Sequence, residues 1–377
     1  MGTDQHMLAV LTSRFGAISE TFVQRHIASL CPGKTVVAAR QIVNADWNVA
    51  APLLHLRQYH DAPGSLFRLL GLWRLDARSC ALHAFLHKHG VTTILAEWLN
   101  FAALWLPVAR HLGVRYFAHA HGYDVTARLL ASPGARFLYR QLHAMDGIIT
   151  VSHLTRARLL HTCGLDPARV HVVPCGVRVP PSMPARCPSA HVRCIMVGRL
   201  VPKKGPLLAL QAFQQAYRDN TALRLEIIGD GPLRMACEAY CLAQSLKGVV
   251  TLHGNRPAAF VSERLAAADI FLLHSMTTAH GDEEGVPVAI LEAMAHGLPV
   301  VSTRHAGIPK VVLHNVTGLL VEERDWQQMG HYIAQLAINP LARQLLGRAG
   351  YQRAAKEYAV EQELARLREI LFCGASE

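Results

Sequence analysis

The chain has 377 residues, which is too long for one ordinary hydrophobic core, so the length predicts two domains. Apolar residues make up 51% and charged residues 17%, a composition that excludes a disordered protein. The net charge of +11 is concentrated in residues 1–180, where 18 Lys and Arg stand against 9 Asp and Glu, a net +9. We therefore expect this half to attract anionic partners.

Several classes of protein find no support in the sequence. No zinc-finger spacing, RNP-like strand or clustered run of Lys and Arg indicates nucleic-acid binding. The opening MGTDQHMLAV lacks the basic head and separate apolar stretch of a secretory signal, and no run approaches the ~18 to 20 apolar residues of a membrane span. The nine cysteines include no CxxC pair, so we expect buried packing instead of metal ligation. We predict a cytoplasmic protein that binds no nucleic acid.

Short apolar runs alternate with helical patterns along the chain. In the first half these runs are LAVLTSRFG, KTVVAAR, VTTILAEW, VRYFAHAHG, DGIITVS and VHVVPCG. In the second half they are VRCIMVGR, LRLEIIGDG, GVVTLHG, ADIFLLHS and GLPVVSTR. Strands that are apolar throughout and separated by helices favour parallel sheets covered on both faces.

A stretch with four prolines, VRVPPSMPARCPSA, separates the two series and is typical of a linker. We therefore expect an α/β protein of two doubly wound, Rossmann-like domains that face a central cleft. Ligands of such domains bind outside the carboxyl ends of the strands. The expected boundaries are residues 1–180, a linker at 181–190, residues 191–350, and a C-terminal helical segment at 351–377 that packs back towards the first domain.

Two loops of the second half have the composition of ligand sites. VGRLVPKKGPLLALQAF follows a strand and precedes a helix, so Arg199 and Lys204 lie in a strand-to-helix loop that suits a diphosphate. A solvated surface loop is the plainer interpretation. In IIGDGPLR, Gly229 and Gly231 allow close backbone approach to a ligand, although an ordinary turn explains them nearly as well.

The run GDEEGVPVAILEAMAHGLPVV places one carboxylate before a helix and another inside it. Pro287 is a favourable first helical residue, which predicts a helix over 287–296 with Glu284 in the preceding loop and Glu292 in the helix. Glu292 then lies ~7.5 Å along the axis from Pro287. Backbone N–H groups at 285–288 are available to phosphate or sugar oxygens between the two acids.

Taken together, these segments resemble the retaining glycosyltransferases of family 4, which have the GT-B fold and two glutamates separated by seven residues. Glu284 and Glu292 have that spacing within EGVPVAILEAMAHGLPVV. The likeness extends to GRLVPKKG, GDGPLR, ADIFLLHS and TGLLV. In the first half, SRFGAISETFVQRHI and FAHAHGYDV resemble the opening and the HG-x-D loop of exopolysaccharide-type members, including the colanic-acid group.

The resemblance implies roles for individual residues. It makes His121 the group that approaches the donor sugar and its anomeric carbon, with His119 as a rival. Arg199 and Lys204 would stabilise the departing diphosphate, and Glu284 would hold the sugar hydroxyls. The residues implied to bind the donor are Gly16, Gly231, Gly285, Val286, Pro287 and Glu292, the last of them through the ribose.

The same resemblance implies the substrates. The donor would be a UDP- or GDP-sugar bound by residues 191–350. The acceptor would be a polyprenyl-diphosphate-linked saccharide bound by residues 1–180. No Asp-x-Asp motif is present, so we expect neither a metal nor a cofactor. The basic, aromatic-containing segment 65–90 favours a peripheral position on an anionic membrane surface, or else packs its apolar side on the first sheet.

Other functions stay open at the level of sequence. A sugar-nucleotide epimerase of similar two-domain shape would release free nucleotide and an altered sugar without an acceptor. An oxidoreductase would use GDGP to bind NAD, although no acidic ribose ligand ends a following strand. A non-catalytic sugar-nucleotide-binding module would bind the donor without turnover.

Overall fold

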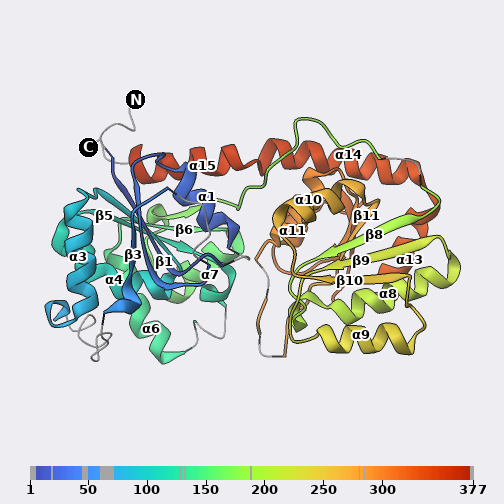
Figure 1. The fold of residues 1–377 in the computed structure, drawn as a ribbon, viewed down its shortest axis with the longest axis horizontal. Coiled ribbons are helices and arrows are strands. Elements are labelled where there is room, and N and C mark those ends of the chain that lie inside the picture. Colours follow the sequence, from blue (N-terminus) through green and yellow to red (C-terminus); the bar gives the residue numbers. More distant parts are fainter. Residues whose placement is uncertain are drawn as a thin grey trace. The chain divides into compact units, whose positions relative to one another are not determined.

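The computed structural model describes residues 6–17, 20–44, 50–59, 72–126, 130, 132–186, 189–279, 281–283 and 285–373. The chain forms two compact units (Figure 1). The first comprises Met1–Pro174 together with Glu363–Glu377, and the second comprises Cys175–Gln362. Each unit has its own hydrophobic core. The fold class predicted from the sequence, two doubly wound α/β domains, is confirmed for the described chain.

Within the described residues, the first unit contains a seven-stranded parallel sheet of order β3-β2-β1-β4-β5-β6-β7. Residues 8–11 of the central strand β1 are fully buried, because helices cover both faces of the sheet. In register, Leu8 of β1 pairs with Thr35 of β2 and with Thr93 of β4. The strands are β1 Leu8–Phe15, β2 Thr35–Ile42, β3 Leu53–His55, β4 Thr93–Glu97, β5 Arg115–Ala120, β6 Gly147–Thr150 and β7 Val170–Val172.

Figure 1 shows α1 and α15 on one side of this sheet and α3 and α4 on the other. Local signals set several helix boundaries. The Asp76 carboxylate accepts from the Ser79 N–H at the start of α3, and α4 ends at Gly113, whose φ is 67°. The helices are α1 Thr21–Ser29, α3 Ala77–Lys88, α4 Leu99–Leu112, α6 Pro133–Tyr139, α7 His153–Cys163 and α15 Val360–Arg368.

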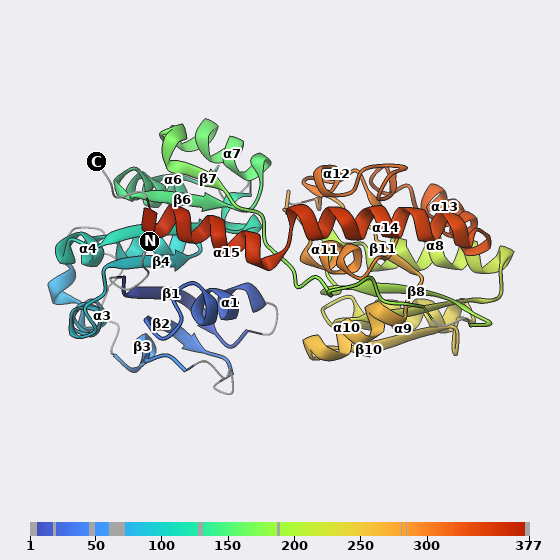
Figure 2. The same cartoon turned by 90° about the horizontal axis from the view of Figure 1, so that it is seen from above.

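The described part of the second unit contains a six-stranded parallel sheet of order β10-β9-β8-β11-β12-β13. In Figure 2, α8 and α13 lie side by side, as do α11 and α14. The strands are β8 Val192–Val197, β9 Leu223–Ile228, β10 Val250–Gly254, β11 Ile270–Leu273, β12 Val300–Thr303 and β13 Gly318–Val321. The helices are α8 Pro206–Asp219, α9 Arg234–Ala243, α10 Ala258–Ala267, α11 Val288–Ala295, α12 Ile308–Val311, α13 Trp326–Ile338 and α14 Pro340–Glu357.

Every apolar run identified in the sequence overlaps one of these strands. The short edge strands β3 and β13 were not among the predicted runs. The C-terminal stretch is helical as expected, but it is interrupted at residues 358–359, where Ala359 pairs with Val177 as an isolated bridge. Beyond that break, the Arg368 guanidinium donates to the carbonyls of Ser29 and Leu30 in the first unit.

The proline-rich stretch belongs to the second unit. The Arg186 guanidinium donates to the carbonyls of Ala268, His296 and Gly297 at 2.7 to 3.0 Å. The Tyr351 hydroxyl donates to the Pro180 carbonyl at 2.8 Å. These bonds fasten Pro180 and Arg186 of the proline-rich stretch to other parts of the second unit.

The segment at 65–90 is described from residue 72 onward, and residues 65–71 lie outside the described residues. In the described part, Trp73 is 8% exposed and lies 5.3 Å from the His83 ring, while Leu82 and Leu86 of α3 are buried. These apolar side chains therefore pack on the protein core. Among the described helices, none combines the length and apolarity needed to cross a membrane.

Candidate active site

In each sheet the order of strands reverses at one place, between β1 and β4 in the first unit and between β8 and β11 in the second. Ligands of doubly wound sheets bind outside the carboxyl ends of the strands at such a switch point. The predicted residues follow these strands or their neighbours. Gly16 follows β1 and His121 follows β5, whereas Arg199 and Lys204 follow β8 and Gly285 lies between β11 and α11.

In the second unit, the loop after β8 is fastened to the loop after β9. The Leu200 N–H donates to the Asp230 carbonyl at 2.9 Å, and the Leu233 N–H donates to the Leu200 carbonyl at 3.0 Å. A Cβ on Gly231 would lie 2.5 Å from the Leu200 oxygen. The small size of Gly231 is thus required by the neighbouring loop, a reason that the sequence interpretation, which assigned it to ligand approach, had missed.

Arg199 and Lys204 lie in the loop that these bonds hold. Arg199 is exposed and Lys204 is half-buried. The neighbouring Lys203 forms an ion pair with Asp282 at 3.1 Å and donates to the Glu283 carbonyl at 3.4 Å. Lys203 therefore links the loop after β8 to the loop after β11.

Residues 285–287 form the loop that leads into α11, and residues 288–292 form the first part of that helix. Glu284 lies outside the described residues. The Gly285 carbonyl accepts from the Gly307 N–H at 3.1 Å. Pro287 is the N-cap residue of α11 and not its first helical residue, so the predicted helix is one residue too long at each end. The side chain of Pro287 makes no capping hydrogen bond, so the positive end of the helix dipole faces the loop that contains Val286.

Glu292 lies in the second turn of α11, as predicted. It is half-buried, although Leu291, Ala293 and Met294 beside it are fully buried. The Glu292 carbonyl accepts from the His296 ring at 2.7 Å. The apolar flanks thus belong to the buried face of the helix, and the glutamate lies towards its more open face.

One further carboxylate organises this region. Glu323 accepts from the Thr277 N–H at 2.8 Å, from the Thr277 hydroxyl at 3.1 Å and from the His305 ring at 2.6 Å. Burial raises the pKa of Glu323, but these hydrogen bonds outweigh burial and hold the pKa below its ordinary value. Glu323 therefore fastens the loop after β11 to the loop after β12.

In the first unit, Gly16 is required by its own neighbours. Its φ is +88°, and a Cβ there would lie 2.2 Å from the Asn44 carbonyl oxygen. The Val43 N–H also donates to the Phe15 carbonyl at 2.8 Å. The glycine therefore lets the chain after β2 cross directly over the end of β1.

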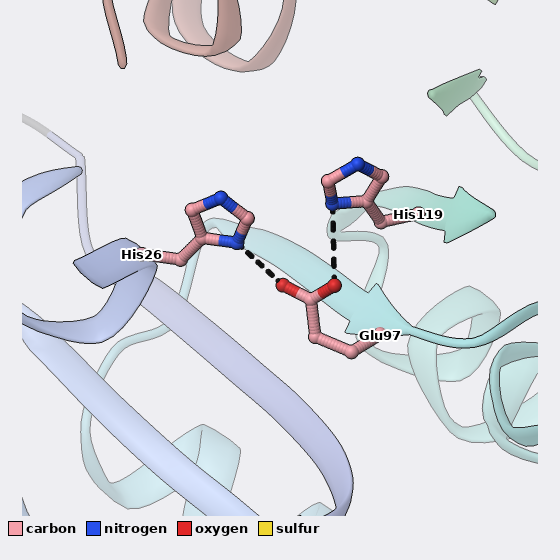
Figure 3. Close-up of side chains that lie close together, drawn as sticks. All are labelled: His26, Glu97 and His119. Carbon is pink, nitrogen blue, oxygen red and sulfur yellow. Dashed lines mark hydrogen bonds and ion pairs between the residues drawn. The ribbon is translucent and has the colours of Figure 1, made fainter. Parts of the chain in front are cut away.

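His121 belongs to a buried cluster of histidines around one carboxylate. Its Nε2 lies 2.8 Å from Glu97 Oε2, and the other oxygen, Oε1, lies 2.7 Å from His26 Nδ1. His119 Nδ1 lies 3.2 Å from Oε2, without hydrogen-bond alignment. Figure 3 shows how α1, β4 and β5 bring His26, Glu97 and His119 together. Both candidate histidines of the sequence, His119 and His121, therefore contact the same carboxylate.

The pKa values of the clustered groups are shifted in different directions. Burial lowers the pKa of His26, but the charges of Glu97 and Glu363 and hydrogen bonds to them outweigh burial and raise it to about 9. Burial raises the pKa of Glu97, yet the charges of His26 and His119 hold it well below its ordinary value. Burial and the charge of His119 lower the pKa of His121 to about 4.

Aromatic rings enclose His121. The Phe22 ring centroid lies 4.3 Å from that of His121, and the Trp98 centroid lies 4.6 Å away. Trp98 has φ +79°, a conformation that bulky side chains rarely adopt, and it directly follows β4. Such strain is concentrated at functional sites, so the backbone at Trp98 supports a site here.

The aspartate of the HG-x-D loop has a different partner. Asp124 Oδ2 accepts from the Leu99 N–H at 2.7 Å and so caps α4, which lacks a side-chain cap at Trp98. The Asp124 carbonyl accepts from the Tyr139 hydroxyl at 2.6 Å. Burial raises the pKa of Asp124 to about 8. Asp124 therefore fixes the loop that carries His121.

Among the described residues, His26, Glu97 and His119 are the side chains that offer three ligand atoms within 4.8 Å of one another. Zinc accepts such a donor set. Two ligands of one tetrahedral zinc lie about 3.4 Å apart, given a zinc–ligand distance of about 2.1 Å. The 2.7 Å between His26 Nδ1 and Glu97 Oε1 is instead a hydrogen-bond length. We interpret the group as a hydrogen-bonded cluster.

The sequence had not identified Glu97 or His26 as site residues. Glu97 is the last residue but one of the run VTTILAEW, so the rule that selected His121, a polar residue at the carboxyl end of a strand, would also have found it. His26 and Glu363 lie within helices and carry no comparable signal. Only the packing of α1 and α15 brings His26 to Glu97 and Glu363 to His26.

Two family models match the chain. Residues 34–179 match the model described as Glycosyltransferase Family 4, and residues 189–353 match the model described as Glycosyl transferases group 1. Together the two matches include most of both units. The first match contains Glu97, His119 and His121, and the second contains residues 199–292.

Similar proteins agree with these matches. The amylovoran biosynthesis glycosyltransferase AmsK of Erwinia amylovora is 31% identical, over 98% of this chain and 93% of the relative. The colanic acid biosynthesis glycosyltransferase WcaL of Escherichia coli is 34% identical over 67% of this chain, but the alignment spans only 63% of that relative's length. The crystal structure of HepE from Anabaena in complex with UDP and glucose has a TM-score of 0.78 at 16% identity, over 97% and 99% of the two chains, which shows the same fold.

Proposed function

Since this chain belongs to glycosyltransferase family 4, we propose that it is a retaining hexosyltransferase of exopolysaccharide biosynthesis that uses a UDP- or GDP-sugar. The acceptor is a saccharide carried on a polyprenyl diphosphate at the inner face of the cytoplasmic membrane. The relatives AmsK and WcaL, named for amylovoran and colanic acid biosynthesis, support the pathway class. The epimerase, oxidoreductase and non-catalytic hypotheses lose their basis with the family assignment.

The observation that carries the proposal is the cationic loop at the switch point of the second sheet. Arg199 and Lys204 follow β8, and the uncapped amino terminus of α11 follows β11, the strand beside β8. Two cations and a helix dipole suit the diphosphate of a nucleotide sugar and the charge that develops on it as the sugar leaves. HepE, which shares the fold, has been crystallised with UDP.

The resemblance supplies the remaining roles in the proposal. Glu284 holds hydroxyls of the donor sugar and Glu292 those of the ribose, while Gly285, Val286 and Pro287 present backbone to the phosphates. His121 approaches the donor sugar near the anomeric carbon. The acceptor hydroxyl attacks from the face that the leaving diphosphate occupied, so the reaction needs no nucleophile from the protein.

Thermal unfolding with UDP, GDP, ADP and NAD in turn tests the donor assignment. A ligand at 100 times its Kd stabilises the folded protein by about 2.7 kcal/mol, which raises the Tm of a unit of this size by several degrees. We expect a shift with UDP or GDP that Lys204→Ala removes. The control, Lys247→Ala, changes an exposed lysine in a different loop and should retain the shift. Stabilisation by NAD alone would contradict the proposal.

Product analysis tests the reaction itself. Incubation with UDP-glucose, UDP-galactose or GDP-mannose and a lipid-linked acceptor should transfer the sugar with retention at the anomeric carbon. We propose that the reaction needs no divalent metal, so EDTA should leave the rate unchanged. Complete loss of transfer in EDTA, restored by Mg²⁺ or Mn²⁺, would argue against this mechanism.

A further inference from the structure

We propose that Glu97 and His26 are positioning residues that hold His121 as the neutral tautomer protonated at Nε2, so that its Nδ1 is a hydrogen-bond acceptor for the donor sugar. The use of that acceptor rests on the proposed function, but the tautomer itself does not. The proposal stands on the geometry of one buried carboxylate, Glu97, that joins the rings of His26 and His121.

The charge on Glu97 is the first step. Its side chain is completely buried, and an unpaired buried carboxylate would be costly. His26 Nδ1 lies 2.7 Å from Oε1, which supplies the opposite charge at hydrogen-bond distance. An ionised carboxylate only accepts hydrogen bonds. Every ring nitrogen that is hydrogen-bonded to Glu97 must therefore carry a proton.

The charge on His26 is fixed from its other side. His26 Nε2 lies 3.5 Å from Glu363 Oε1, and the Arg25 guanidinium lies 3.2 Å from Glu363 Oε2. His26 thus lies between two carboxylates, and its pKa of about 9 keeps it cationic at neutral pH. The carboxylates of Glu97 and Glu363 are balanced by the His26 imidazolium and the Arg25 guanidinium before any charge on His119 is counted, so these groups need no charge on His121.

The tautomer of His121 follows from these charges. His121 Nε2 lies 2.8 Å from Glu97 Oε2, so Nε2 carries the proton that it donates. With its pKa near 4, the ring holds no second proton at neutral pH, and Nδ1 retains its lone pair. Among the described residues, the titratable groups that face His121 are Glu97 from β4, His119 from β5 and His26 from α1. Of these, Glu97 alone favours a second proton on His121, and it is already neutralised by His26.

This arrangement has a chemical consequence at the sugar. A neutral ring with a free Nδ1 accepts a hydrogen bond from a sugar hydroxyl. A cationic ring would instead donate, and its positive charge would oppose the charge that develops on the sugar ring as the diphosphate leaves. The rings of Phe22 and Trp98, 4.3 and 4.6 Å away, restrict rotation of the His121 ring, which would take Nε2 away from Glu97 and put a ring carbon in its place.

Nitrogen NMR of the whole protein, labelled with ¹⁵N-histidine, tests the tautomer without any ligand. The chain has 22 histidines, so the His121 signals are assigned by their loss in His121→Gln. We expect a protonated Nε2 and an unprotonated Nδ1 from about pH 8 down to about pH 5. A proton on Nδ1, or a doubly protonated ring at neutral pH, would overturn the proposal from the wild-type spectrum alone.

Substitution tests the role of the carboxylate. In Glu97→Gln the amide both donates and accepts, so it no longer selects one tautomer, and we expect the His121 signals to average between the two forms. The matched control is Glu226→Gln, which removes another carboxylate hydrogen-bonded to a histidine, His253, at 2.9 Å in the second unit. Unchanged His121 signals in Glu97→Gln would show that Glu97 does not set the tautomer.

Kinetics connects the tautomer to the reaction. Release of nucleotide from UDP-glucose or GDP-mannose is followed across pH, and we expect Glu97→Gln to lower kcat at least tenfold with little change in KM. Glu226→Gln should leave both kcat and KM unchanged. If His121→Gln retains full activity, the sugar-facing role of His121 is wrong, and with it the use of Nδ1, while the NMR result still decides the tautomer. The two failures are therefore distinguishable.

Discussion

Replacement of His26 by glutamine should change how the stability of the first unit depends on pH. The pKa of His26 is raised from 6.5 to about 9 in the folded protein. Because a raised pKa means that the folded state binds the proton more tightly, the stabilisation is complete below about pH 6.5 and is lost as pH rises through 9. At 1.36 kcal/mol per unit, the loss between pH 6 and pH 9 is about 3 kcal/mol.

Urea unfolding followed by tryptophan fluorescence measures this loss. Four of the five tryptophans precede residue 175, so the signal reports mainly on the first unit. The free energy of unfolding of the wild type should exceed that of His26→Gln by the largest amount near pH 6, and the difference should shrink by about 3 kcal/mol at pH 9. The subtraction removes the contribution of other titrating groups. A difference that stays constant within about 0.5 kcal/mol would show that His26 is not held as a cation, and the charge assignment of the cluster would fail.

Two further results are expected. Gly16→Ala should destabilise the first unit by roughly 2 to 4 kcal/mol, because its Cβ would lie 2.2 Å from the Asn44 oxygen, whereas Gly33→Ala, at a similar φ of +75° with no atom within 4 Å, should lose only about 1 kcal/mol. Equal losses in the two variants would refute the close approach at residue 44. The protein should also float with anionic liposomes at low salt and detach at high salt, and failure to float at low salt would end the proposal of membrane attachment.

The sequence alone determined the two sheets and their parallel order of strands and helices. This was possible because strands of a parallel sheet that is covered on both faces are mainly apolar, as in LAVLTSRFG and GLPVVSTR, and here they alternate with helical patterns. The strands that were missed, β3 and β13, are short and lie at the sheet edges. The start of α11 was placed one residue early, because proline is typical of the first helical position but here occupies the cap position before it.

The sequence also located the loops that carry the candidate site, since Arg199, Lys204, His121 and Glu292 each occupy a recognisable position after a strand or within a helix. It could not show which of these side chains have partners. Only the tertiary structure showed that Gly16 and Gly231 are required by neighbouring backbone.

The partners of His121 were likewise decided by the tertiary structure. His26, Glu97 and Glu363 are far apart in sequence and lie on α1, β4 and α15, and the packing of these elements brings them together. Local patterns record the face and period of each helix or strand, whereas a buried charge network depends on contacts between elements that no local pattern contains. The protonation state of His121 is therefore a property of the fold, although the histidine itself can be found in the sequence.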